Sequence, residues 1–210
     1  MSDSETRGRR RRMDKAVPGF RCAQSGLHLL STATLRYDLN MTRYIALLRA
    51  VNVGGTGKLP MADLKSICQD LGFARVETYI ASGNVVFESK AAPSKVKAEL
   101  EARLLEYAGK PIGVMVRTAA EMRTVLKANP FPDAEGKYTY AIFLDHRPPR
   151  DALDRVVGQS HEKMSLGDRE IFVHYPSGMG RSKLEIPAAK TGTARNMNTV
   201  AKLAEMASKP

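Results

Sequence analysis

The chain has 210 residues, of which 43% are hydrophobic, and its formal net charge is +11. This length suffices for one large domain or two small ones with a buried core. No apolar stretch approaches the roughly 20 residues of a membrane span, and the two cysteines are too far apart in sequence for a disulfide framework or a zinc site. We therefore expect a cytoplasmic globular protein with no membrane partner, no metal and no cofactor.

The first forty residues differ in character from the rest of the chain. They contain a run of four arginines at 9–12 and show no sustained helical or strand period. We expect residues 1–40 to be a disordered extension, with Met41 as an alternative translation start. A basic arm that binds nucleic acid and a targeting peptide are the two other interpretations. The remaining residues still carry a net charge of +7, which favours a phosphate-bearing partner.

An organised hydrophobic pattern begins shortly after Met41. Apolar runs, helical periodicity and turn residues predict, in chain order, a strand at 44–51, a helix from Pro60 to Leu71, a hairpin with strands at 76–81 and 85–88, a helix from Val96 to Tyr107 and a strand at 112–117. This order, βαββαβ, is that of a ferredoxin-like α-β plait.

A second cycle follows the first. It is predicted to contain a capped helix at 118–126, a strand at 138–144, a short helix at 153–157, a hairpin with strands at 163–166 and 170–175, a helix at 183–190 and a last helix from Met197 to Ala204. We therefore expect an α+β fold of two α-β plait subdomains, residues 41–117 and 118–210, with the second ending in helices.

The glycine-rich loop before Lys58 invites comparison with a nucleotide-binding P-loop. That motif needs a glycine where this chain has Asn52 and a hydroxyl residue where it has Leu59, so nucleotide hydrolysis of that type is excluded. A loop that ends near a helix N-terminus can still favour an anion through free backbone N–H groups. The alternative is an ordinary turn between strand and helix.

Two polar segments near the C-terminus carry the strongest indication of a site. Residues 177–183 combine glycines, hydroxyl groups and two cations, and residues 191–199 are dense in hydrogen-bonding side chains. A cation such as Arg195 beside a helix N-terminus opposes the helix dipole, and a bound anion would relieve that conflict. The alternative is that Asn196 or Asn198 caps the helix while the cations are solvated.

Four of these stretches, at 49–55, 78–85, 181–184 and 193–200, resemble the hallmark segments of the family of uncharacterised proteins designated domain of unknown function 1697. The resemblance covers residue 41 to about 207. It implies a bacterial cytoplasmic protein built from two α-β plait domains, and it implies no activity.

If the hallmark loops converge, their polar side chains form one anion site. The leading hypothesis is a binding protein for a phosphate-bearing ligand, nucleic acid included. The alternatives are a small-molecule enzyme that uses Ser82, Lys183 or Arg195 in a cleft between the subdomains, and an interaction scaffold without a site. The candidate site residues are Arg49, Asn52, Lys58, Tyr79, Ser82, Asn84, Arg181, Ser182, Lys183, Thr193, Arg195, Asn196 and Asn198.

Overall fold

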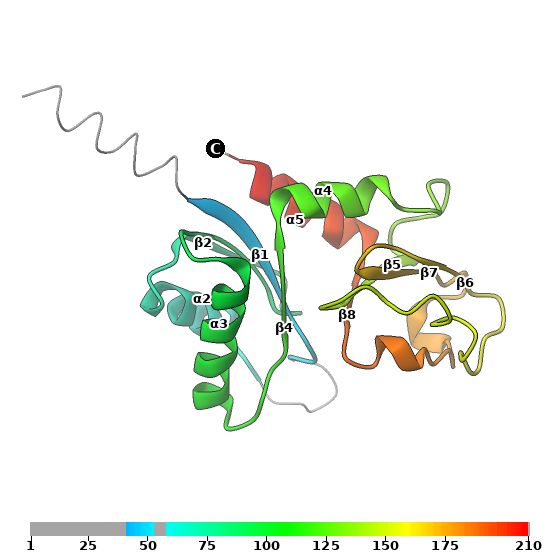
Figure 1. Ribbon diagram of the computed structural model, residues 1–210, viewed down its shortest axis with the longest axis horizontal. Helices are drawn as coiled ribbons and strands as arrows, with labels where there is room; N and C mark the ends of the chain where they lie inside the picture. Colours follow the sequence, from blue (N-terminus) through cyan, green and yellow to red (C-terminus); the bar gives the residue numbers. More distant parts are fainter. Residues whose placement is uncertain (1–40, 53–57, 210) are drawn as a thin grey trace, which may run out of the picture. The chain divides into compact units, whose positions relative to one another are not determined.

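The first half of the chain folds around an antiparallel sheet. The computed structural model describes residues 41–52 and 58–209 (Figure 1), so the expectations for residues 1–40 and for the loop at 53–57 fall outside the described residues. The sheet has the order β2-β3-β1-β4 and consists of β1 (Thr42–Leu48), β2 (Ala74–Tyr79), β3 (Asn84–Ser89) and β4 (Val114–Thr118).

Two helices, α2 (Met61–Asp70) and α3 (Pro93–Ala108), cover one face of this sheet (Figure 1). The helical spacing of their apolar residues places these on the side that faces the strands, where they join a core with the buried residues of β1 and β3. Gly109 ends α3 in the left-handed conformation that favours glycine. The βαββαβ prediction for the first half is therefore confirmed.

The second half contains a second antiparallel sheet with the same topology. Its order is β6-β7-β5-β8, which repeats β2-β3-β1-β4 strand for strand. The strands are β5 (Thr139–Phe143), β6 (Lys163–Leu166), β7 (Glu170–His174) and β8 (Thr193–Asn196). The fold is thus α+β with two plait-like sheets, although the sequence shows no repeat.

Three secondary-structure predictions for the second half are wrong. The segment predicted as a helix at 153–157 consists of turns, and Val157 forms an isolated antiparallel bridge with Glu185. That bridge also prevents the helix predicted at 183–190, of which one 3-10 turn, η2 (Pro187–Ala189), is present. A similar turn, η1 (Met179–Arg181), precedes it, and strand β8 stands where only the approach to a helix was expected.

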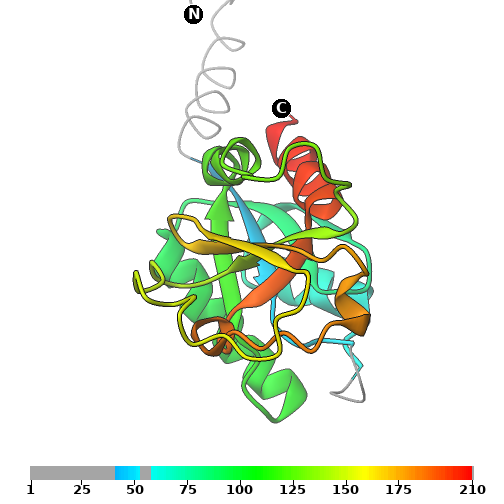
Figure 2. The same cartoon turned by 90° about the vertical axis from the view of Figure 1, so that its right-hand side faces the viewer.

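Two further helices, α4 (Ala119–Lys127) and α5 (Met197–Ser208), each follow the last strand of a sheet. A capping box between Thr118 and Glu121 begins α4, as predicted. Figures 1 and 2 show the two helices next to each other, and together with the facing sides of both sheets they enclose one hydrophobic core. The described residues, 41–52 and 58–209, consequently belong to one compact unit. The subdomain boundary at 117/118 falls between β4 and α4 and stays a prediction.

Candidate functional site

Two of the four hallmark stretches, 78–85 and 193–200, meet at the side chain of Arg195, which lies in β8 and is 7% exposed. Its guanidinium reaches from the second sheet into the first. The five N–H groups have five good acceptors: Asn84 Oδ1 at 2.5 Å, Thr193 Oγ1 and the Ala194 carbonyl at 2.8 Å, the Ser82 carbonyl at 2.8 Å and the Leu48 carbonyl at 2.9 Å.

Neighbouring polar side chains complete this network. Asn84 donates to the Tyr79 carbonyl at 3.0 Å and to the Ser82 hydroxyl at 2.9 Å, while Thr193 donates to the Leu48 carbonyl at 3.3 Å. Nearby, Asn52 closes the base of the glycine-rich loop. Its side chain exchanges hydrogen bonds with the backbone of Leu59 and donates to the Ala81 carbonyl at 2.7 Å.

The Arg195 network is structural. No carboxylate accepts from its guanidinium, and burial lowers the pKa of Arg195 to about 10. Because every N–H is already used by the protein, none remains for a bound anion. The stretches 78–85 and 193–200 therefore converge, but the guanidinium between them connects one sheet to the other.

The other predicted residues take separate positions. Arg49 is exposed and donates to the Lys190 carbonyl at 3.3 Å. Lys58 is also exposed, whereas Tyr79 packs against the core between the sheets. Asn196 is the N-cap of α5 and accepts from the Thr199 N–H at 2.9 Å, as the capping alternative predicted. Asn198 is exposed and lies against Gly136, where an added Cβ would come 2.2 Å from its Oδ1.

The hallmark stretch at 181–184 lines a pocket of about 270 Å³ in the second half. One wall is the segment 158–162 and the other is the segment 175–183, which includes Arg181, Ser182 and Lys183. The two walls touch at Gly158, whose φ is +71° and where a Cβ would lie 2.2 Å from the Lys183 carbonyl oxygen. Only glycine lets the walls approach so closely.

Glu162 connects the two walls through hydrogen bonds. It is 8% exposed; one carboxylate oxygen accepts from the Ser182 hydroxyl and the other from the Ser160 N–H at 2.7 Å. These hydrogen bonds, the Ser182 hydroxyl first, lower the pKa of Glu162 to about 2. Burial and the Glu162 charge raise the pKa of Tyr175, on the opposite wall, to about 12. The carboxylate is thus ionised at neutral pH and Tyr175 is neutral.

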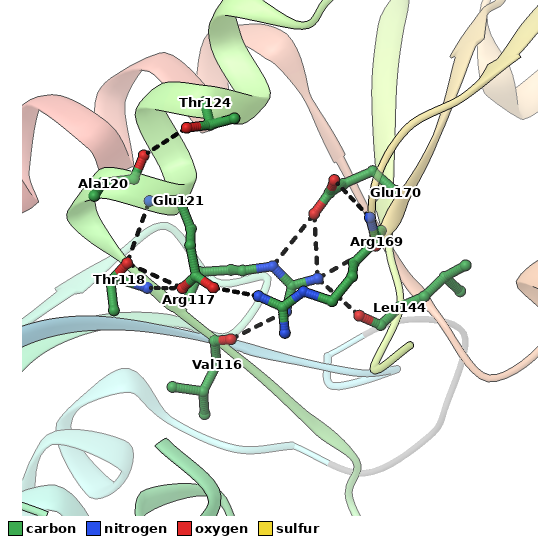
Figure 3. Close-up of polar contacts among 9 residues, drawn as sticks. All are labelled: Val116, Arg117, Thr118, Ala120, Glu121, Thr124, Leu144, Arg169 and Glu170. Carbon is green, nitrogen blue, oxygen red and sulfur yellow. Dashed lines mark hydrogen bonds and ion pairs between the residues drawn. The ribbon is translucent and has the colours of Figure 1, made fainter. Parts of the chain in front are cut away.

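Sequence reasoning missed one polar group of equal weight, Arg117 in β4, whose side chain is 2% exposed (Figure 3). It donates to Glu170 Oε1 at 3.2 and 3.3 Å and to the Leu144 carbonyl at 2.7 Å. Figure 3 draws it together with Arg169, which pairs with Glu121. The sequence did carry one indication of this burial. Alternate residues of a strand point to the same face, so Arg117 shares a face with Met115, and the second half of the chain buries that face.

Groups that could hold a metal ion do not occur within residues 41–52 and 58–209, where no three His, Cys, Asp or Glu side chains cluster. In the same ranges, no helix is both long and apolar enough to cross a bilayer.

Cys68 is buried in the first core, and burial raises the pKa of its thiol to about 12, so it is unreactive.

Comparison with known proteins agrees with this architecture. The family described as "Protein of unknown function (DUF1697)" matches residues 41–172. A solved structure, that of the conserved bacterial protein SP0830 from Streptococcus pneumoniae, is similar with a TM-score of 0.67 and 25% identity, over 80% of this chain and 99% of that one. No curated protein matches the sequence.

Proposed function

Since this chain belongs to the DUF1697 family, whose description names no activity, we propose a function from the geometry alone: the protein binds a phosphate-bearing ligand in the pocket between residues 158–162 and 175–183. We place this activity in the cytoplasm, where small phosphate esters are made and consumed. The observation that carries the proposal is a pair of unused cations, Arg181 and Lys183, at a concave polar surface.

Arg181 and Lys183 differ from the buried arginines described above in having no partner within the described part of the chain. Neither side chain has a hydrogen bond or an ion pair with any residue of the described part of the chain, and both are exposed. By contrast, Arg195 is buried with an acceptor for every N–H, and Arg117 is buried and paired with Glu170. A guanidinium and an ammonium that face one pocket can bind a phosphate without first breaking an internal ion pair.

The rest of the pocket suits a ligand with a carbon portion beside its phosphate. Ser177 and His161 add polar groups, and Tyr175 contributes a ring edge-on to Tyr140. Beside the pocket, Val157 and Met179 are 63% and 42% exposed, which is unusual for apolar side chains. Contact with a ligand would cover such surface.

The size of the pocket favours a small molecule. Its volume of about 270 Å³ lies just below the range of roughly 300–1,000 Å³ usual for small-molecule sites. A single phosphate with a small apolar or aromatic substituent fits this space. Nucleic acid presents the same phosphate group many times, but it normally engages several cations along a strand, and its binding weakens steeply with salt.

The enzyme hypothesis has less support at this pocket. A general base works best with a pKa near the working pH, whereas Glu162 has a pKa of about 2 and is held by two hydrogen bonds. Ser182 donates to this weakly basic carboxylate, so it is not activated as a nucleophile. We therefore propose binding rather than catalysis.

The test is a panel of phosphate monoesters, nucleotides and short oligonucleotides, measured by calorimetry on the full chain and on the Arg181→Ala/Lys183→Ala variant. We expect at least one monoester to bind the wild type with an affinity that the double variant lowers at least tenfold. Arg150→Ala/Lys65→Ala is the matched control, because it removes the same charge from exposed, unpaired side chains elsewhere.

Three outcomes separate the hypotheses. A monoester that loses affinity only in the pocket variant supports the proposal. Preferential, strongly salt-dependent binding of oligonucleotides, weakened equally by both double variants, would replace it with a general electrostatic surface. No binding of any phosphate compound at low salt would leave the scaffold hypothesis.

A further inference from the structure

We propose that a second, separate anion site lies between the two sheets, where Arg117 and Arg169 face a cavity of about 450 Å³. Both halves of the fold build this cavity. The first half supplies Ser94 and Lys97 from the start of α3 and Arg117 from β4; the second supplies Asp145 and His146 after β5 and Arg169 before β7. None of these residues belongs to the pocket of Arg181 and Lys183.

The first reason is that Arg117 is buried with an incomplete set of partners. Nη1 has a single acceptor, the Val116 carbonyl at 3.0 Å, so one of its two N–H groups has none among the described residues. Nε and Nη2 share one carboxylate oxygen of Glu170 at 3.3 and 3.2 Å, which is long for a charged pair. A 2%-exposed guanidinium with an unmet N–H at a cavity wall is a ready anion ligand.

The second reason is the charge around the cavity. Lys97, Arg117 and Arg169 line it as cations, and Asp145 is the one carboxylate in its lining, while Glu170 and Glu121 pair with the two arginines from outside the lining. Asp145 is already engaged by Lys97 at 2.5 Å. Burial, and after it repulsion from Arg169, lowers the pKa of Arg117, while the charge and hydrogen bond of Glu170 act in the opposite direction. A bound anion would relieve that repulsion.

The third reason is the start of α3, which adds to the two arginines. This helix of 16 residues begins with no side-chain cap on Ala92 and has no acidic residue in its first turn. Pro93 has no N–H and the Val96 N–H bonds to the Ala92 carbonyl, so the N–H groups of Ser94 and Lys95 are those left for an acceptor, and Ser94 lines the cavity.

Together these groups fit a small oxyanion, held by the planar fork of Arg117 or Arg169. Inorganic phosphate and a short dicarboxylate share this chemistry. Because both halves contact the cavity, an occupant would bind the folded chain and stabilise the arrangement of the two sheets.

The experiment is an NMR titration of the ¹⁵N-labelled full chain with inorganic phosphate and, separately, with malonate, each against sodium chloride at matched ionic strength. We expect a saturable shift of the Ser94 amide and of the Arg117 Nε–H with at least one probe; the probe that binds identifies the source of the oxyanion. Arg169→Gln should weaken this binding at least tenfold. Arg147→Gln is the matched control, because Arg147 also pairs with a carboxylate, that of Asp168, but lies outside the cavity.

The Arg181→Ala/Lys183→Ala variant keeps the two proposed sites distinguishable. The Ser94 shift should persist in it, whether or not the first pocket binds any phosphate ester. Should Arg169→Gln fail to fold, Lys97→Gln provides the second test at the same cavity. The absence of a saturable shift in the wild type, or equal binding by wild type and Arg169→Gln, would overturn the proposal.

Discussion

Arg117 and Arg195 occupy equivalent positions in the two sheets. Each lies in the last strand of its sheet, directly before the N-cap of the following helix, Thr118 or Asn196. Each is buried, and each donates to backbone carbonyls of the opposite half: Arg117 to Leu144, and Arg195 to Leu48. Two reciprocal arginines thus tie together the two sheets, whose topologies repeat.

The first prediction concerns the tie made by Arg195. Lysine keeps the charge of Arg195 but offers three N–H groups in place of five, so Arg195→Lys leaves buried acceptors without a donor. We expect a loss of about 3 kcal/mol in the free energy of unfolding, since each unsatisfied buried group costs roughly 1–3 kcal/mol. Urea denaturation measures it. Arg147→Lys, at an exposed ion pair, should change stability by less than about 0.5 kcal/mol; equal effects of the two substitutions would contradict the structural role.

The second prediction separates Arg117 from its partner Glu170. Arg117→Met leaves the buried carboxylate of Glu170 without its cation, and we expect a cost of about 3–5 kcal/mol. Arg117→Met/Glu170→Met should cost less than the two single substitutions together. A double-mutant cycle by urea denaturation should give a favourable coupling of about 1–3 kcal/mol; strict additivity would mean that the pair does not interact.

The third prediction uses two glycines with the same backbone conformation. Gly83 has a φ of +76°, and a Cβ there would lie 2.3 Å from Val51 Cγ2, whereas Gly72, with a φ of +77°, has open space around it. Gly72→Ala should cost only the left-handed strain of about 1–2 kcal/mol. Gly83→Ala adds overpacking beside the Arg195 network and should cost about 3 kcal/mol or more. Thermal unfolding of the two variants checks that Gly83→Ala is the more destabilising. Equal destabilisation would mean that only the left-handed strain matters at both positions.

The fourth prediction follows from the lowered pKa of Glu162. A carboxylate whose pKa falls from its ordinary value of 4.5 to about 2 on folding stabilises the folded state above pH 4.5, and this stabilisation is lost as the pH falls toward 2. Ser182→Ala removes the hydrogen bond that contributes most to the shift. The variant should therefore lose less stability than the wild type between pH 5 and pH 3, as measured by urea denaturation at both values; parallel losses would show that Glu162 does not titrate as described.

The first sheet could be predicted from the sequence because its elements carry complete local signals. The helix from Met61 to Asp70 has a full apolar stripe and is followed by Gly72 in a left-handed conformation, and the hairpin around Gly83 has its turn residues. Such signals depend on neighbours in sequence, so a single chain suffices to read them.

The second half and the candidate site depend on contacts between distant residues. Strand β8 has four residues, too few for a period, and it is recognisable only by its pairing with β5. The helical spacing of Leu153 and Val156 comes from packing under the second sheet rather than from a helix. The same holds for Arg195: its position before a helix suggested a cation at an anion site or in solvent, but it is buried against distant acceptors on Leu48, Ser82 and Asn84.

The proposed function requires that a phosphate group binds between residues 158–162 and 175–183. The most direct measurement is amide chemical-shift mapping on ¹⁵N-labelled protein with the tightest monoester of the panel. We predict that saturable shifts concentrate in these two segments and disappear in Arg181→Ala/Lys183→Ala. Shifts centred instead on residues 82–84 and 193–195, or unchanged by the double substitution, would contradict it.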